Sequence, residues 1–167
     1  AIESFKKQDI DGGVKVLVVD NDSTDSTRAW LATQRDLYTI MNTPQQGVAA
    51  AWNQALSWVF KEGGSEYALV CNNDVVLRPD AYRWLVADSG GFVTCVGSDD
   101  ASKIEPYPDH WGDDDCDEFC QDASQAGGYD APEQKYKRPH PDFSCFLIRR
   151  WVYESVGPFN VEFEGAY

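Results

Sequence analysis

Two stretches of this chain read VKVLVVDND (residues 14–22) and YALVCNND (residues 67–74). In each stretch, a short apolar run ends in clustered Asn and Asp. Short apolar runs bounded by turn residues are typical of buried parallel strands, and open α/β sheets bind ligands beyond the carboxyl ends of such strands. We therefore expect two strands to carry carboxylates to one rim of a sheet. Oxygen ligands of this kind suit a divalent cation together with a sugar or a phosphate.

The rest of the chain alternates between helix-like and strand-like patterns. Apolar residues recur at helical spacing from about Val48 to Phe60, and Gly63-Gly64 follows, which predicts a helix that ends at the glycines. By the same criteria we expect helices at 1–8, after Ser26, at 80–87 and at 149–154, and strands at 38–41, 92–96 and 143–148. This alternation predicts one α/β domain over residues 1–167, with a mostly parallel, doubly wound sheet.

Composition excludes several classes of protein. The chain has 28 acidic and 14 basic side chains and a formal charge of -14, which repels nucleic acid and anionic membrane surfaces. No run approaches the roughly 20 apolar residues of a membrane span, and no signal-peptide pattern opens the chain. We therefore expect no nucleic-acid partner, no membrane span in this segment and a cytoplasmic location, with the parent protein either free or peripheral to a membrane.

Residues from about 98 to 142 break the alternation with Asp, Gly, Pro and scattered aromatic residues. The segment is longer than an ordinary connection, so we expect an acidic loop that is either functional or variable. Tyr107 and Trp111 offer aromatic faces that stack on sugar rings, which makes them candidates for binding an acceptor. The alternative is a solvated loop, and the acidic run at 113–115 is typical of a solvated surface.

The five cysteines fall into two groups. Cys71, Cys95 and Cys145 lie in predicted strands, where we expect reduced thiols that pack as small apolar side chains. Cys116 and Cys120 lie four residues apart in the acidic loop and suit either a disulfide or a metal site with a histidine. Their spacing fits no closed zinc site with four clear ligands, so their role stays open.

Four segments, in their order and spacing, resemble the family 2 glycosyltransferases, which use nucleotide sugars and have a Rossmann-like GT-A fold. The segments are residues 18–25, 42–53, 72–80, and 143–150 with 156–160. The first resembles the family's acidic motif, and the second resembles its motif that runs from an Asn through a Gly into a helix. The third resembles the DXD segment of rhamnosyltransferase-like members, and the fourth resembles the stretch that leads to the acceptor site.

The resemblance implies roles for individual residues. Asp20 would contact the nucleobase, with Asp22 and Gly47 also on the nucleotide side. Asn73 would lie near the ribose, and Asp74 would bind Mn²⁺ or Mg²⁺. These roles make a nucleoside-diphosphate sugar the donor substrate.

Arg149 lies in the segment that would approach the acceptor or a phosphate. The chain also departs from the family pattern, because Trp52 stands where members often have Arg. This substitution leaves a basic contact from that helix to the nucleotide in question, and the alternative is that Trp52 packs in the core.

The two ends of the family pattern also lie outside this sequence. We expect the chain to start after the family's first strand and to end before the Glu-Asp pair that supplies the general base, which would follow Tyr167. Glu162 and Glu164 are the nearest carboxylates and are expected to be loop residues ahead of that base. A missing inner strand would leave an apolar sheet edge, so we also expect self-association or marginal stability.

The leading hypothesis is a glycosyltransferase domain, as in polysaccharide biosynthesis, that moves a hexose or deoxyhexose from a nucleoside-diphosphate sugar to a saccharide or lipid-linked acceptor. By the resemblance the transfer is metal-dependent and inverting. The alternative is a non-catalytic nucleotide-sugar or carbohydrate-binding domain, or an inactive fragment, and turnover separates the two. A nucleotidyltransferase would need a glycine-rich basic loop near the start of the chain, and the sequence has no such loop.

Overall fold

The computed structural model describes residues 1–77, 79–87, 90–94 and 143–162. The predicted acidic loop, with Tyr107, Trp111, Cys116 and Cys120, lies outside the described residues, and so does Glu164. The chain divides into two compact units, of which the first comprises Ala1–Val14 and Cys71–Phe146 and the second comprises Lys15–Val70 and Leu147–Tyr167. Each unit is described by itself, and the expectation of a single domain stays a prediction.

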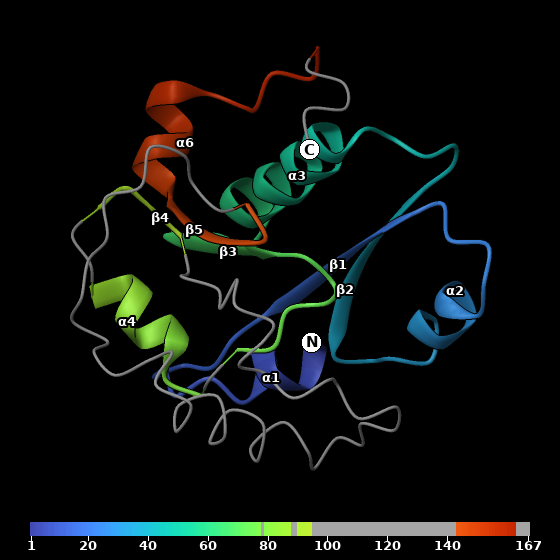
Figure 1. The fold of residues 1–167 in the computed structure, drawn as a ribbon, viewed down its shortest axis with the longest axis horizontal. Helices are drawn as coiled ribbons and strands as arrows, with labels where there is room; N and C mark the ends of the chain where they lie inside the picture. The colour runs from blue at the N-terminus through green and yellow to red at the C-terminus, as the bar shows by residue number, and fades with distance from the viewer. Residues whose placement is uncertain (78, 88–89, 95–142, 163–167) are drawn as a thin grey trace, which may run out of the picture. The chain divides into compact units, whose positions relative to one another are not determined.

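The second unit contains a pair of parallel strands, β1 (Val16–Asn21) and β2 (Leu37–Asn42). They pair in register from Val16 opposite Leu37 to Asn21 opposite Asn42 (Figure 1). The short helix α2 (Thr27–Leu31) lies in the crossover that a parallel pair requires. This pair confirms the parallel sheet predicted from the apolar runs, and it brings the polar ends of both strands to one edge.

The helix predicted from about Val48 to Phe60 is present as α3 (Val48–Ser57), followed without a break by a π-helical turn, η1 (Trp58–Glu62). It buries Leu56 and Phe60, which are 1% and 2% exposed. The run ends at Gly63, where any side chain would place a Cβ atom only 2.8 Å from the Val59 carbonyl oxygen. Position 63 therefore requires glycine because the backbone packs directly against it, and Gly64, with a positive φ of 65°, turns the chain out of the helix.

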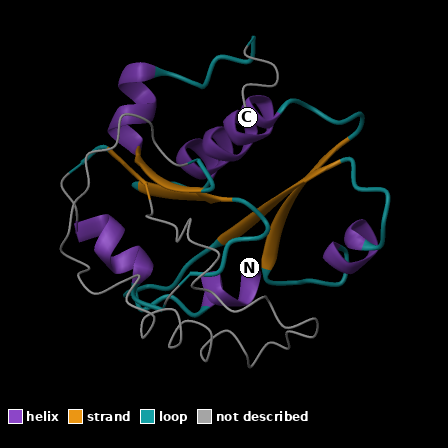
Figure 2. Ribbon diagram, in the orientation of Figure 1, coloured by secondary structure: helices purple, strands orange, loops and turns teal. Residues whose placement is uncertain are grey.

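The remaining strands are β3 (Tyr67–Cys71), β4 (Phe92–Thr94) and β5 (Cys145–Arg149), in the spatial order β3–β5–β4. The central strand β5 buries four successive side chains, residues 145–148, as expected for a strand covered on both faces. The dividing line between the two units falls within β3 and β5. Figure 2 shows the alternation of strands and helices along the described chain.

Two backbone hydrogen bonds give the direction of β5 relative to β3. The amide of Asn72 donates to the Ser144 carbonyl at 2.8 Å, and the amide of Arg150 donates to the Glu66 carbonyl at 2.9 Å. A step forward along β3 thus matches a step backward along β5, which is the pattern of antiparallel strands. The sheet predicted to be mostly parallel therefore includes an antiparallel neighbour.

In the first unit, the N-terminal segment holds the chain that leads into α4 (Ala81–Ala87). The Ser4 hydroxyl, on α1 (Ile2–Lys6), accepts a hydrogen bond from the Leu77 amide at 3.1 Å. The Gln8 side chain accepts one from the Tyr82 amide, in the first turn of α4, at 2.9 Å. Ser4 and Gln8 are both buried, so these bonds satisfy polar groups that water does not reach.

Aromatic side chains fill the core of the first unit next to β4. Phe92 stacks on Phe146 with ring centroids 5.0 Å apart, and Phe143 meets Phe146 edge to face at 5.6 Å.

In the described ranges, no helix combines the length and the apolar character that crossing a membrane requires.

Leu56→Ala should lower the free energy of unfolding by about 2–5 kcal/mol, because it removes a fully buried side chain and leaves a cavity. Val48→Ala, on the same helix but half exposed, should change it by less than about 0.5 kcal/mol. Urea denaturation of both variants measures the difference. Equal losses for the two variants would contradict the assignment of Leu56 to the core.

Candidate polar site at the ends of β1 and β2

Asp20 lies next to the carboxyl end of β1, and its side chain is fully buried. Its Oδ1 accepts a hydrogen bond from Nε of Arg28 at 2.6 Å and another from the Ser23 amide at 3.3 Å. Its Oδ2 is buried as well, and among the described residues it has no hydrogen-bond partner. Buried polar atoms are normally paired, so this oxygen is an exception among the described residues.

Asp20 stays ionised to lower pH than an ordinary aspartate. The Ser23 side chain, as a hydrogen-bond donor, is the largest influence that holds the pKa of Asp20 below its usual value of 3.8, and Arg28 and the Ser23 amide act in the same direction. Burial alone would raise the pKa, but the two partners outweigh it. The free oxygen therefore belongs to a carboxylate, which can only accept hydrogen bonds.

Arg28, on α2, joins the ends of both parallel strands. Besides its ion pair with Asp20, it donates a hydrogen bond to the Asn42 carbonyl at the end of β2. The same guanidinium lies 3.4 Å from Asp22, whose positive φ of 72° turns the chain sharply after β1. Asp20 and Asp22, both predicted from the sequence, are thus brought together around one cation that was not predicted.

Amide side chains tie this edge to the start of α3. Asn21 donates to the Gln46 carbonyl at 2.7 Å and accepts from the Gln46 amide at 2.9 Å. Asn42 donates to both the Asn21 side chain, at 3.2 Å, and the Gln54 side chain, at 2.8 Å. We refer to Asp20, Asn21, Asp22, Arg28, Asn42, Thr43, Gln46 and Gln54 as the polar cluster, which Thr43 joins through a 3.3 Å hydrogen bond to Asp22.

Gly47 directly follows the polar cluster and is the N-cap residue of α3. No side chain caps this helix end, and a Cβ at position 47 would meet no atom within 4 Å. The first amide groups of a helix carry partial positive charge and are suited to anions. Gly47 is thus exposed beside the polar cluster, the chain's own packing would allow a larger residue there, and its nucleotide role stays a prediction.

Asn53, on α3, holds the segment that follows helix α6 (Arg150–Val156). It donates to the Phe159 carbonyl and accepts from the Phe159 amide, both at 2.8 Å. Trp52 packs against the Phe159 ring at 5.5 Å, so the tryptophan that stands in place of a basic residue serves packing. Glu162 lies three residues farther along this segment and is exposed.

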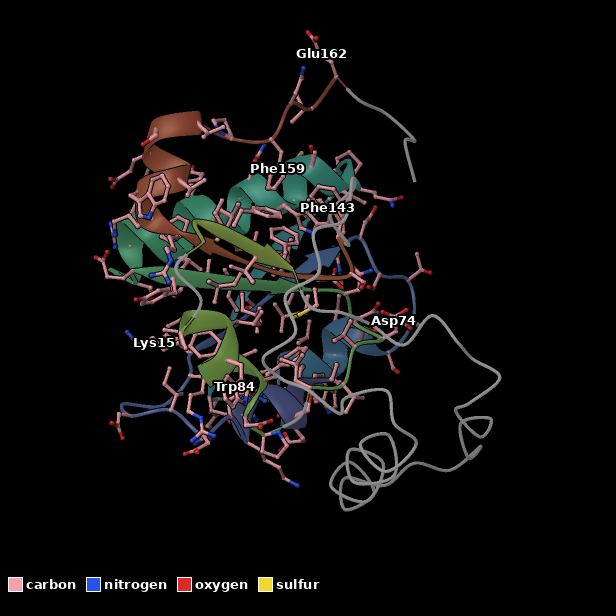
Figure 3. The ribbon with its side chains drawn as sticks, turned by 60° about the vertical axis from the view of Figure 1, so that its left-hand side comes forward. Lys15, Asp74, Trp84, Phe143, Phe159 and Glu162 are labelled. Atoms are coloured by element: carbon pink, nitrogen blue, oxygen red, sulfur yellow. The ribbon has the colours of Figure 1, made fainter. Side chains whose placement is uncertain are left out.

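Asp74 belongs to the first unit and follows β3 directly (Figure 3). It is exposed together with Asn72 and Asn73, in a turn closed by a hydrogen bond from the Val75 amide to the Asn72 carbonyl at 3.4 Å. Within the described ranges, no three His, Cys, Asp or Glu side chains gather in a group suited to a metal. Because Asp20 lies in the other unit, the predicted common rim stays a prediction.

The two arginines at the end of β5 make different contacts. Arg149 lies over the Tyr67 ring at 4.9 Å and donates to its hydroxyl at 3.1 Å, so its expected place near an acceptor stays a prediction. Arg150 donates to the carbonyls of Phe60 and Ser65, each at 2.6 Å, and so binds the end of the η1 turn. Its Nε is 3.2 Å from a Glu66 oxygen without hydrogen-bond alignment, which leaves an ion pair.

Asp20 should contribute stability that depends on pH. Because the folded-state pKa lies below the ordinary value of 3.8, this contribution is complete above that value and is lost as the pH falls through the folded pKa. The difference in free energy of unfolding between wild type and Asp20→Asn should therefore narrow as the pH drops below about 4. Denaturation at a series of pH values measures it, with the exposed Asp11→Asn as control. A constant difference would contradict the assigned pairing.

Asn53→Ala should lower the free energy of unfolding by about 1–3 kcal/mol, because it removes two hydrogen bonds. Hydrogen exchange at the Phe159 amide should speed up in the same variant. Ser57→Ala, on the same helix and without a capping hydrogen bond from its side chain, is the matched control. Unchanged hydrogen exchange at the Phe159 amide in Asn53→Ala would show that the two hydrogen bonds between Asn53 and Phe159 are absent in solution.

A family model described as Glycosyl transferase family 2 matches residues 1–157. No curated protein and no solved structure matched the chain. The matched range contains the polar cluster, Gly47, Asn53 and Asp74, so it spans the two parallel strands and the segment after β3. The chain therefore belongs to glycosyl transferase family 2.

Proposed function

We propose that this chain binds a nucleoside-diphosphate sugar and serves metal-dependent, inverting transfer of the sugar to a saccharide or lipid-linked acceptor. Membership of the family makes the chain a glycosyltransferase, and nucleotide sugars are the typical donors of that family. The observation that carries the proposal is the buried Oδ2 of Asp20, an acceptor without a partner among the described residues.

The chemistry of Asp20 restricts the group that it would bind. Its Oδ1 is already bonded to Arg28 and Ser23, which leaves Oδ2 to bond the ligand. A carboxylate accepts hydrogen bonds and cannot donate them. The ligand must therefore present an N–H or O–H donor to this oxygen. Uracil, thymine and guanine carry an N–H donor on the ring, and adenine and cytosine carry one on the exocyclic amino group.

The start of α3 supplies a place for the diphosphate. Its uncapped amide groups follow Gly47, and Asn21 fixes the preceding residue, Gln46, through two hydrogen bonds. Helix N-termini favour phosphate because the amide groups and the helix dipole both act on the negative charge. The polar cluster and this helix end lie in the same unit, so one ligand can engage both.

Asp74 and Asn73 are our candidates for the metal and the ribose. Both are exposed at a strand end, and carboxylate and amide oxygens are the donor atoms that Mn²⁺ and Mg²⁺ accept, so the residues fit the proposed ion. When bound, such an ion supplies positive charge to the departing diphosphate. We further propose that Arg149, Tyr107 and Trp111 approach the acceptor, and that Glu162 and Glu164 are loop carboxylates that precede the general base.

Titration calorimetry with UDP, GDP and dTDP, each with and without Mn²⁺, tests donor binding. At least one of these should bind. Asp20→Asn should weaken binding of the preferred nucleotide by about tenfold or more, because a hydrogen bond to a charged group is lost. Asp74→Ala should abolish only the part of the affinity that depends on Mn²⁺. Asp11→Ala, an exposed carboxylate, is the control for loss of charge.

The outcomes separate the parts of the proposal. Unchanged affinity of the preferred nucleotide in Asp20→Asn would contradict the role of Asp20, and Mn²⁺ dependence that survives in Asp74→Ala would contradict the role of Asp74. Release of nucleoside diphosphate from a donor that binds would demonstrate turnover. Tight binding without transfer or donor hydrolysis would favour the non-catalytic alternative.

A further inference from the structure

Two thiols face each other at one end of the β3–β5 pair. Cys71 is the last residue of β3, and Cys145 is the first residue of β5. Their sulfur atoms are 3.3 Å apart, and neither cysteine is in a disulfide. Both residues belong to the first unit. This juxtaposition joins positions that are 74 residues apart in the sequence.

The strand register places the two cysteines directly opposite each other. The next pair along the strands, Asn72 and Ser144, is hydrogen-bonded through the backbone. Hydrogen-bonded and non-hydrogen-bonded pairs alternate in antiparallel strands, so Cys71 and Cys145 form a non-hydrogen-bonded pair, for which the Cα atoms are typically about 4.5 Å apart. Disulfides need Cα separations of roughly 4.4–6.8 Å. The strands therefore already hold both residues at a distance that a disulfide can span.

The two thiols differ in access to solvent. Cys145 is 2% exposed, whereas Cys71 is half-buried. A small oxidant can therefore reach the Cys71 sulfur first, and Cys145 is placed to attack that sulfur from within the sheet. We propose that Cys71 and Cys145 are a redox-active pair that closes reversibly into a disulfide between β3 and β5.

The reaction balances with a small disulfide, such as oxidised glutathione, as the oxidant. The Cys71 thiolate attacks one sulfur of the oxidant, which forms a mixed disulfide and releases one glutathione thiolate. The Cys145 thiolate then attacks the Cys71 sulfur, which forms the protein disulfide and releases the second glutathione. Overall, two protein thiols are oxidised, the small disulfide is reduced to two thiols, and the protons pass to the solvent and the released thiolates.

A disulfide between Cys71 and Cys145 would affect the segment that follows β3. Cys71 is followed directly by Asn72, Asn73 and Asp74, so the disulfide would fix the strand end from which that segment leaves. The link to metal binding rests on the proposed function. The formation of the bond does not, and it is tested without nucleotide or metal.

Trypsin gives a direct assay, because it cleaves after Lys and Arg that are not followed by Pro. The expected peptides are 62–83 with Cys71, 84–103 with Cys95, 104–135 with Cys116 and Cys120, and 138–149 with Cys145. The whole chain would be equilibrated in glutathione buffers from reducing to oxidising, alkylated at the remaining thiols, digested and analysed by mass spectrometry. We expect peptides 62–83 and 138–149 to become linked, with the loss of two hydrogen atoms, and to separate again on reduction.

Two variants make the assay specific. Cys95→Ser should keep the link between peptides 62–83 and 138–149. Cys71→Ser should remove this link, and Cys145 should then be alkylated when the chain is unfolded before digestion. Alkylation of both Cys71 and Cys145 at every glutathione ratio would overturn the proposal. A link from Cys71 to another cysteine, or a link between two chains on a non-reducing gel, would overturn it as well. The wild-type result stands even where Cys71→Ser folds poorly.

Discussion

Arg28 contacts three oxygen-bearing groups at the carboxyl ends of β1 and β2: the side chains of Asp20 and Asp22 and the carbonyl of Asn42. A carboxylate that is fully buried, as Asp20 is, destabilises a fold unless a partner offsets the loss of hydration. Arg28 provides that partner but engages only one of the two carboxylate oxygens. The same contact that stabilises the buried charge therefore leaves an acceptor available, and the geometry of the polar cluster depends on it.

Three asparagines extend this arrangement to the helix and the segment beyond it. Asn21 and Asn53 each donate to the carbonyl and accept from the amide of one residue, Gln46 and Phe159 respectively. Asn42 donates to two side chains at once. An amide side chain carries both a donor and an acceptor, so it can bond the backbone carbonyl and the backbone amide of one residue, which a carboxylate cannot do. These asparagines therefore orient the backbone of the segments that they bond.

The parts of the fold that follow from local pattern were predictable. The apolar spacing from Val48 to Phe60 indicated α3, and the run before Asp20 indicated β1, because burial of one face or of both faces leaves a periodic trace in the sequence. The direction of β5 left no such trace, since a strand buried on both faces has the same apolar sequence whether it runs parallel or antiparallel to its neighbour. The π-helical turn η1 could not be predicted either, because the apolar spacing indicates a helix without distinguishing a π-helical turn from an α-helical one.

In the candidate site as well, the residues that follow from local pattern were predictable and those that depend on distant partners were not. Asp20 and Asp22 could be found because strand ends collect polar residues, whereas the role of Arg28 depends on Asn42, 14 residues away, and that of Asn53 on Phe159, 106 residues away. Such partners are chosen by tertiary packing, which a single sequence does not encode locally. A basic residue in the first turn of the helix that follows an acidic strand end is the signal that points to Arg28, because a buried carboxylate needs a counter-ion.

Charge balance connects the polar cluster to the proposed metal. The chain carries a formal charge of -14, and a nucleoside diphosphate would add further negative charge. Within the polar cluster Arg28 is the one cation, and its charge is already matched by Asp20 and Asp22. Trp52, at the position where a basic residue would help, packs on Phe159 instead. Compensation for the diphosphate must therefore come from the helix dipole of α3 and from a cation that is not part of the cluster, which supports transfer that depends on a divalent ion.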